Sequence, residues 1–115
     1  MKAPVEGDVI ELDAPTSSAG HEQPGRRPAL VVSVDAFHEL GLAFVCPVTT
    51  RGGKAVRSKS SLEVAIPAGL RVTGMILPHQ LRAVDWNARN AAHLDRVPRA
   101  TLLAVRARLK AILEV

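Results

Sequence analysis

Polar residues that can bind a phosphate or transfer a proton are placed at the ends of three apolar segments of this sequence. They are His21, Glu22, Gln23, Arg26 and Arg27 before one segment, Thr49 after another, and Gln80 and Arg82 on a third. Cleavage of RNA through its ribose 2′-hydroxyl needs a proton acceptor, donors that neutralise the phosphorane, and a proton for the leaving 5′-oxygen. Arginine supplies paired, permanently charged donors, and threonine adds one from a restricted rotamer. The set therefore favours phosphodiester chemistry on RNA, provided that these segment ends meet.

Other catalytic chemistries find little support in the residue pattern. The four histidines are scattered, the chain has a single cysteine, Cys46, and no metal-ligand spacing is recognisable. The serines lack the turn pattern that surrounds a nucleophile. Gly52 and Gly53 lead into a basic loop and not into a helix, so they do not form a phosphate-binding loop. We expect an activity without metal or cofactor.

Short apolar runs separated by turn residues indicate the elements that must position these side chains. Strands are predicted at residues 9–12, 29–34, 42–48, 62–66, 74–77 and 80–85. The second run is continuously apolar, which is typical of a strand buried on both faces. Pro47 cannot donate a ladder hydrogen bond and predicts a sheet edge or a strand end. The fold class is mainly β, as a small antiparallel barrel or a strongly bent sheet.

The C-terminal segment has a different period. From Pro98 onward, Leu102, Val105, Leu109 and Ile112 follow one another at spacings of three and four, which predicts one amphipathic helix. Basic residues in its second half suit the negative end of the helix dipole.

Composition sets the general class of the protein. With 115 residues, of which 47% are hydrophobic, we expect one domain over residues 1–115 with a core of its own. The lone Cys46 excludes an internal disulfide and favours a cytoplasmic location. It is predicted to be a buried, unreactive thiol. The net charge of +4 favours an anionic partner, and no apolar run approaches the length of a membrane span.

Four motifs in order resemble one known family over nearly the whole chain. They are GDVI at residues 7–10, GHEQPGRRPALVVS at 20–33, CPVTT at 46–50 and HQLRAVDW at 79–86. With the closing helix, this pattern is similar to that of the MazF/PemK toxins. The resemblance implies an SH3-like β-barrel homodimer that cleaves single-stranded RNA as a metal-independent, sequence-selective endoribonuclease. It also implies inhibition by an acidic antitoxin of the MazE type.

The same resemblance implies roles for individual residues. The family's essential arginine and threonine match Arg27 and Thr49, and its loop acid matches Glu22, as base or as organiser of the loop. Gln80 matches a glutamine of the substrate groove. Further contacts with RNA are expected from His21, Gln23, Arg26, Arg51, Lys54 and Arg82. Two alternatives remain open at this point: a non-catalytic toxin on the same barrel, similar to the CcdB toxins, and a plain RNA-binding barrel.

Overall fold

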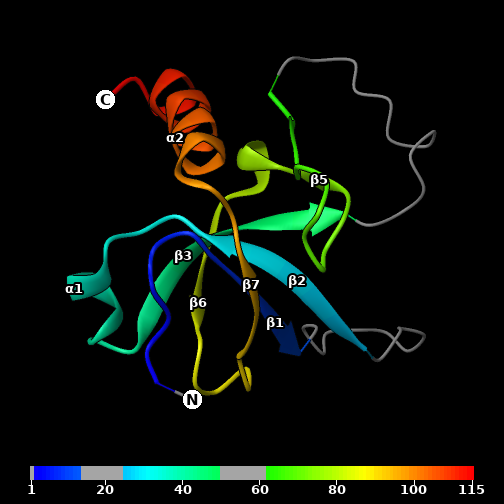
Figure 1. Cartoon of the computed structure of the whole chain (residues 1–115). Helices are drawn as coiled ribbons and strands as arrows, with labels where there is room; N and C mark the ends of the chain where they lie inside the picture. The colour runs from blue at the N-terminus through cyan, green and yellow to red at the C-terminus, as the bar shows by residue number, and fades with distance from the viewer. Residues whose placement is uncertain (1, 14–24, 50–61) are drawn as a thin grey trace, which may run out of the picture.

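An antiparallel sheet with a C-terminal helix packed on it makes up most of the computed structural model (Figure 1), which describes residues 2–13, 25–49 and 62–115. The strands are β1 (Asp8–Asp13), β2 (Arg26–Val31), β3 (Leu42–Thr49), β4 (Val64–Ala65), β5 (Met75–Ile76), β6 (Arg82–Asp85) and β7 (Ala92–Arg96). The helices are α1 (Asp35–His38), the short 3₁₀ helix η2 (Pro78–Gln80) and α2 (Arg99–Leu113).

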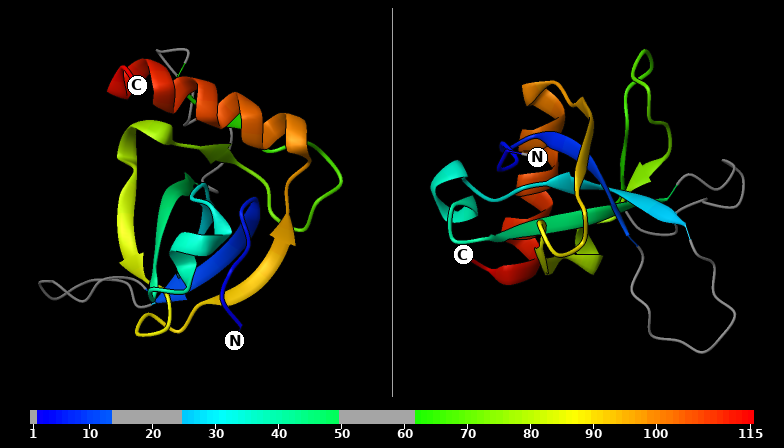
Figure 2. Two further views of the ribbon diagram at one scale, coloured as in Figure 1. Left: turned by 90° about the vertical axis from the view of Figure 1, so that its left-hand side faces the viewer. Right: turned by 90° about the horizontal axis from the view of Figure 1, so that it is seen from below.

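The sheet is built around β3. Its order is β4-β5-β3-β2-β1-β7, and β6 pairs with the first half of β3, so β3 has β2 on one side and β6 followed by β5 on the other. The sheet curves so strongly that β6 and β7, joined by a turn, close one side of it (Figure 2). This half-barrel with a C-terminal helix confirms the predicted fold class.

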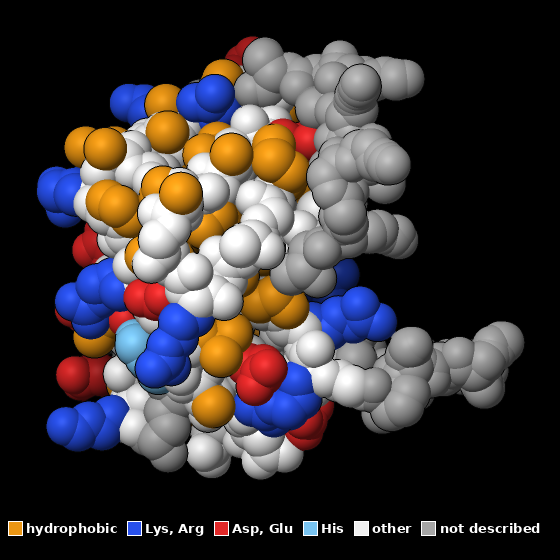
Figure 3. All heavy atoms as spheres, turned by 45° about the vertical axis from the view of Figure 1, so that its right-hand side comes forward, with side chains coloured by type: hydrophobic (Ala, Val, Ile, Leu, Met, Phe, Trp, Pro, Cys, Tyr) orange, Lys and Arg blue, Asp and Glu red, His pale blue; other side chains and the backbone are white. Residues whose placement is uncertain are grey.

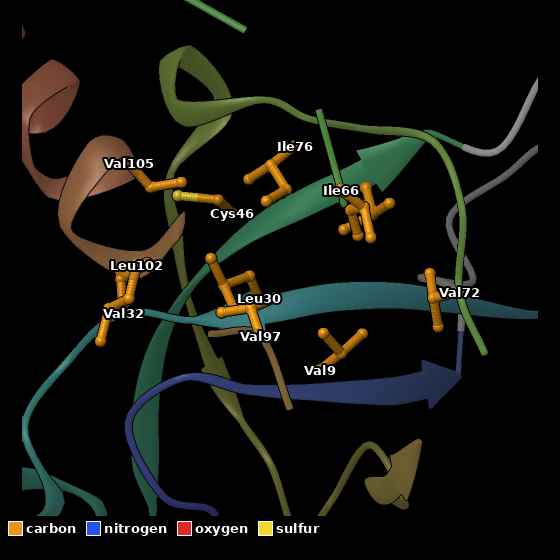
Figure 4. Packing of buried hydrophobic residues seen from close by; sticks show 11 residues of the cluster. Val9, Leu30, Val32, Cys46, Ile66, Val72, Ile76, Val97, Leu102 and Val105 are labelled. Carbon is orange, nitrogen blue, oxygen red and sulfur yellow. The ribbon is translucent and has the colours of Figure 1, made fainter. Parts of the chain in front are cut away.

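The second half of β2 is buried on both faces, as its continuous apolar sequence predicts. Leu30 joins a cluster beneath α2, whereas Val31 joins a second cluster on the other face of the sheet. Strand alternation explains this division, because successive side chains point to opposite faces. On the first face, Leu102 and Val105 of α2 pack over the sheet near Cys46 (Figure 4).

Pro47 lies inside β3, and the prediction that it marks an edge or a strand end is wrong. The backbone N–H of Leu77 donates to the Pro47 carbonyl at 2.9 Å, which places that carbonyl on the β5 side of the strand. A backbone N–H at position 47 would point to the same side, because both polar groups of a residue in an antiparallel strand point to one neighbour. The donor that proline lacks is therefore missing on the β5 side and not on the β2 side. The pairing of β6 ends at Val45 and that of β5 begins at Val48, so the proline occupies the junction between them.

Element ends differ from the sequence prediction in several places. β2 begins at Arg26, before Pro28, and η2 precedes a shorter β6. The sequence does not predict β7, because AHLDR contains none of the Val, Ile, Thr, Tyr, Phe or Trp residues typical of strands. In the structure only Leu94 and Asp95 of this strand are partly buried. It pairs with β1 in the sheet order given above. Helix α2 follows Pro98 as predicted, but Ile112 is exposed and does not extend the buried stripe.

No helix in the described part of the chain is long and apolar enough to cross a membrane.

Candidate active site

The two adjacent arginines at the start of β2 have different environments. Arg27 is exposed, whereas Arg26 is partly buried against β1 and the β6–β7 turn. Alternation along β2 is the cause, because neighbouring residues of a strand project from opposite faces. Arg27 therefore presents its guanidinium to solvent near the start of a strand whose last three residues, Ala29–Val31, are buried in the core.

Thr49 ends β3 at the same end of the sheet at which β2 begins, because the two strands are antiparallel. Their ladder stops at the pair Ala29–Pro47, so Arg27 and Thr49 each lie two residues beyond it. Past that pair the strands diverge toward the right of Figure 1. The fold thus gives a guanidinium and a hydroxyl to one end of the sheet, each on a strand end that is fixed by pairing behind it.

Gln80 and Arg82 are placed differently relative to that end. Gln80 is exposed on η2, which packs against β3 and α2. Arg82 is exposed on β6 and pairs with Val45, four residues before Thr49. Four strand residues correspond to about 13 Å. The structure therefore separates Arg82 from the strand ends that carry Arg27 and Thr49.

Five predicted site residues lie outside the described part of the chain, namely His21, Glu22, Gln23, Arg51 and Lys54. The first three belong to the connection between β1 and β2, and the last two to the connection between β3 and β4.

Arg26 makes internal contacts with every guanidinium nitrogen. Its Nε donates to Glu11 at 3.3 Å and one Nη donates to the Asp13 carboxylate at 2.8 Å. The other Nη donates to the backbone carbonyls of Glu11 at 3.0 Å and Asn90 at 2.5 Å. Hydrogen bonds from Asn90 and Arg26 lower the pKa of Asp13 below its ordinary value of 3.8. No sequence motif pointed to Asp13 or Asn90, although alternation along β2 could have indicated different roles for Arg26 and Arg27.

Cys46 and His38 are among the buried titratable side chains. Cys46 is buried as predicted, and this burial raises the pKa of its thiol to about 12. The ring of His38 lies between the Ser33 hydroxyl, 2.6 Å from Nε2, and the Pro4 carbonyl, 2.7 Å from Nδ1. The His38 carbonyl in turn accepts a hydrogen bond from the indole of Trp86 at 3.1 Å. These contacts make His38 and Trp86 parts of the packing. No three His, Cys, Asp or Glu side chains are grouped as a metal site within residues 2–13, 25–49 and 62–115.

Charged and apolar side chains occupy different regions of the surface. On the face shown in Figure 3, apolar side chains are most numerous in the upper half, where α2 lies, and charged side chains in the lower half. The large exposed apolar side chains of α2 are Leu103, Ile112 and Leu113. A second group at the α1 end of β3 comprises Val34, Leu40, Leu42 and Phe44.

Comparison with known proteins assigns this arrangement to a family. The model of the PemK-like, MazF-like toxins of type II toxin–antitoxin systems matches residues 6–113. The endoribonuclease PemK of Escherichia coli is 37% identical over 97% of this chain and 84% of its own length. The endoribonuclease toxin ChpB of Escherichia coli strain K12 is 38% identical over 94% of this chain and 92% of its own. A crystal structure of MazE–MazF from Deinococcus radiodurans superposes with a TM-score of 0.87 at 39% identity, covering 100% of this chain and 99% of that one. With the half-barrel fold and the four motifs, these matches show that the chain belongs to the PemK-like, MazF-like toxin family.

Proposed function

We propose that this protein is an endoribonuclease toxin that cleaves single-stranded RNA without a metal ion or another cofactor. The observation that carries the proposal is the exposed Arg27 at the same sheet end as Thr49, in a chain that belongs to a toxin family. Two of its relatives carry the name endoribonuclease. Single strands suit such a site because their bases are unpaired and their ribose can reach an in-line geometry.

The reaction is a transesterification at phosphorus. The ribose 2′-oxygen loses its proton and forms a bond to phosphorus, and the bond from phosphorus to the 5′-oxygen breaks. The leaving oxygen takes up a proton, so the products are a 2′,3′-cyclic phosphate and a 5′-hydroxyl end. Arg27 donates paired hydrogen bonds to the phosphorane oxygens and Thr49 donates one more. Glu22 either accepts the 2′-proton or orders the residues around it.

Other polar residues bind the RNA strand on either side of the cleaved bond. Gln80 on the exposed surface of η2 contacts a base or the backbone. We assign further RNA contacts to His21, Gln23, Arg51, Lys54 and, more distantly, Arg82. Basic side chains strengthen RNA binding by releasing counterions, so affinity falls as salt rises.

The protein acts as a cytoplasmic homodimer that a cognate antitoxin inhibits. The net charge of +4 is complementary to an acidic antitoxin chain. One of the structural relatives is a MazE–MazF crystal structure, which supports a partner of the same kind here. The exposed apolar side chains of α2, Leu103, Ile112 and Leu113, are suited to a contact between two copies.

The decisive experiment is incubation of the purified protein with mixed-sequence RNA in EDTA, followed by sequencing of new 5′-hydroxyl ends. We expect cleavage at a short preferred sequence, and we expect a 2′-deoxy nucleotide at that site to prevent it. RNA that is bound but remains intact would instead indicate an RNA-binding barrel. Neither binding nor cleavage would indicate a non-catalytic toxin, and cleavage that requires magnesium would contradict the proposed mechanism.

A further inference from the structure

Asp13 is held at the end of β1 through all of its polar groups. Its backbone N–H donates to the Arg89 carbonyl at 3.0 Å, and its own carbonyl accepts from Arg89 Nε at 2.8 Å. One carboxylate oxygen accepts from Arg26 at 2.8 Å and the other from the Asn90 side-chain amide at 2.6 Å. These bonds join the end of β1 to the start of β2 and to the β6–β7 turn, all at the lower end of Figure 1.

The turn is shaped to make these contacts. Asn90 has a φ of 52°, in the left-handed region that asparagine tolerates better than most residues. In this conformation its carbonyl accepts a hydrogen bond from Arg26 while its side-chain amide reaches Asp13. Asp13 and Asn90 are 77 residues apart in the sequence, so the contact fixes strands from opposite ends of the chain.

We infer that Asp13, Arg26 and Asn90 form a clamp that positions Arg27 for RNA cleavage, an inference that rests on the proposed function. Arg27 follows Arg26 directly, and the β2–β3 ladder begins only at Ala29. On the other side, β2 is paired with β1 through the pairs Asp13–Arg26 and Leu12–Arg27. The side chain of Arg26 therefore acts where the strand that carries Arg27 has lost one of its two neighbours.

The clamp gives Arg26 a role other than RNA binding. Its guanidinium makes four hydrogen bonds to three residues, a pattern that needs the planar fork of arginine. A lysine would keep the positive charge seen by RNA but could not make these bonds together. Conversely, replacing Asp13 with asparagine leaves every cation in place, so RNA binding should not weaken while positioning is lost.

The test compares Arg26→Lys, Asp13→Asn and Asn90→Gly with the wild-type protein. Glycine at 90 accepts the positive φ and removes only the side-chain bond. We measure kcat and KM on a fluorescent RNA in EDTA, and hydrogen exchange of the segment from β1 to β2. The matched control is Arg96→Ala, because Arg96 contacts Asp8 at 3.1 Å, at the opposite end of β1.

We expect each clamp variant to lower kcat roughly tenfold or more with little change in KM, because small displacements at a reacting centre are costly. We also expect kcat of the double variant Arg26→Lys/Asp13→Asn to be no lower than kcat of the more impaired single variant. Exchange should rise at the end of β1 and the start of β2 in the clamp variants and not in Arg96→Ala, which should keep its kcat.

Two results would overturn the inference. One is a raised KM with unchanged kcat in Arg26→Lys together with wild-type rates in Asp13→Asn, which would make Arg26 an RNA contact. The other is unchanged hydrogen exchange in all three clamp variants. Exchange does not depend on activity, so a wild-type protein that cleaves no RNA would refute the proposed function, while the clamp would still be judged by exchange.

Discussion

Two neighbouring arginines of one strand have different surroundings in this protein. Arg26 is engaged by Glu11, Asp13 and Asn90, whereas Arg27 is exposed at the end of the strand. Charge alone does not distinguish them, because both guanidinium groups are permanently ionised. What distinguishes them is the face of β2 from which each projects, and this decides which variants should affect chemistry and which should affect positioning.

Replacement of Arg27 should remove catalysis without removing the fold. Arg27→Ala is expected to abolish RNA cleavage, and Arg27→Lys to slow it roughly 100-fold, because a lysine cannot donate paired hydrogen bonds to the phosphorane. The measurement is the single-turnover rate on a labelled RNA, with circular dichroism as the check on folding. Thr49→Val, which keeps the branched shape and removes the hydroxyl, should also slow the reaction. Full activity in a folded Arg27→Ala protein would remove Arg27 from the site.

Asp13 should make stability depend on pH in acid. Its pKa in the folded protein is lowered by hydrogen bonds from Asn90 and Arg26, so its contribution is fully present above the unfolded-state value near 3.8 and is lost as pH falls through the lower folded-state value. Urea titrations of the wild type and Asp13→Asn should therefore differ by a constant amount above about pH 5 and converge below about pH 4. The pKa of Asp95 is also lowered, by hydrogen bonds from the backbone N–H groups of Arg71 and Arg96. Asp95 is present in both proteins, so its contribution cancels in the difference between their free energies of unfolding. A difference that widens in acid would contradict the assignment.

At the scale of elements, the site depends on strands that are anchored before they reach it. Ala29–Val31 of β2 and Val45, Cys46 and Val48 of β3 are buried, and the pairing of the two strands ends at Ala29 and Pro47. Helix α2 covers one face of these strands through Leu102 and Val105. An ion pair between Arg106 and Glu6, and a hydrogen bond from Arg106 to the Val32 carbonyl at 2.9 Å, tie the same helix to the sheet.

The docking of α2 should be visible in the free energy of unfolding. Leu102 is only 4% exposed, so Leu102→Ala is expected to cost about 2–4 kcal/mol, through lost burial and the cavity that remains. Leu103→Ala is the matched control, because its side chain lies on the same helix and is 47% exposed. It should cost less than about 1 kcal/mol in denaturant titrations at low protein concentration. Equal losses in the two variants would show that α2 is not seated as described.

At the scale of the whole molecule, the apolar end of α2 bears on the proposed homodimer. Leu113 is 52% exposed although it belongs to an otherwise anchored helix. Leu113→Lys should shift the protein toward a species of 12.3 kDa in sedimentation, because a buried lysine at a contact between two copies would lose its hydration. The cation also suits the C-terminal end of a helix, so the fold of the monomer should be preserved.

Leu40→Lys is the control for this experiment, since Leu40 is 75% exposed in the connection between α1 and β3. It should leave the dimer intact. Dissociation by Leu40→Lys and not by Leu113→Lys would place the contact at the α1 end of β3, and a wild-type protein at monomer mass would refute the homodimer.

The sequence by itself determined the apolar strands, the C-terminal helix and the resemblance that selects Arg27 and Thr49, because these depend on local periodicity and on motifs read along the chain. It did not reveal β7, whose five residues include no β-branched side chain and are mostly exposed. The sequence also led to the wrong prediction that Pro47 marks a sheet edge or a strand end. Whether a missing N–H leaves a hydrogen bond unmade depends on which strand lies beside the proline, and the local sequence does not specify that strand.

Only the tertiary structure decided that Arg26 is engaged by Asp13 and Asn90. The physical reason is that the partners of a side chain are set by the order and register of strands, which bring to Arg26 two residues that are 13 and 64 positions away along the chain. A local pattern specifies the face from which a residue projects, but the curvature of the whole sheet determines what it meets there.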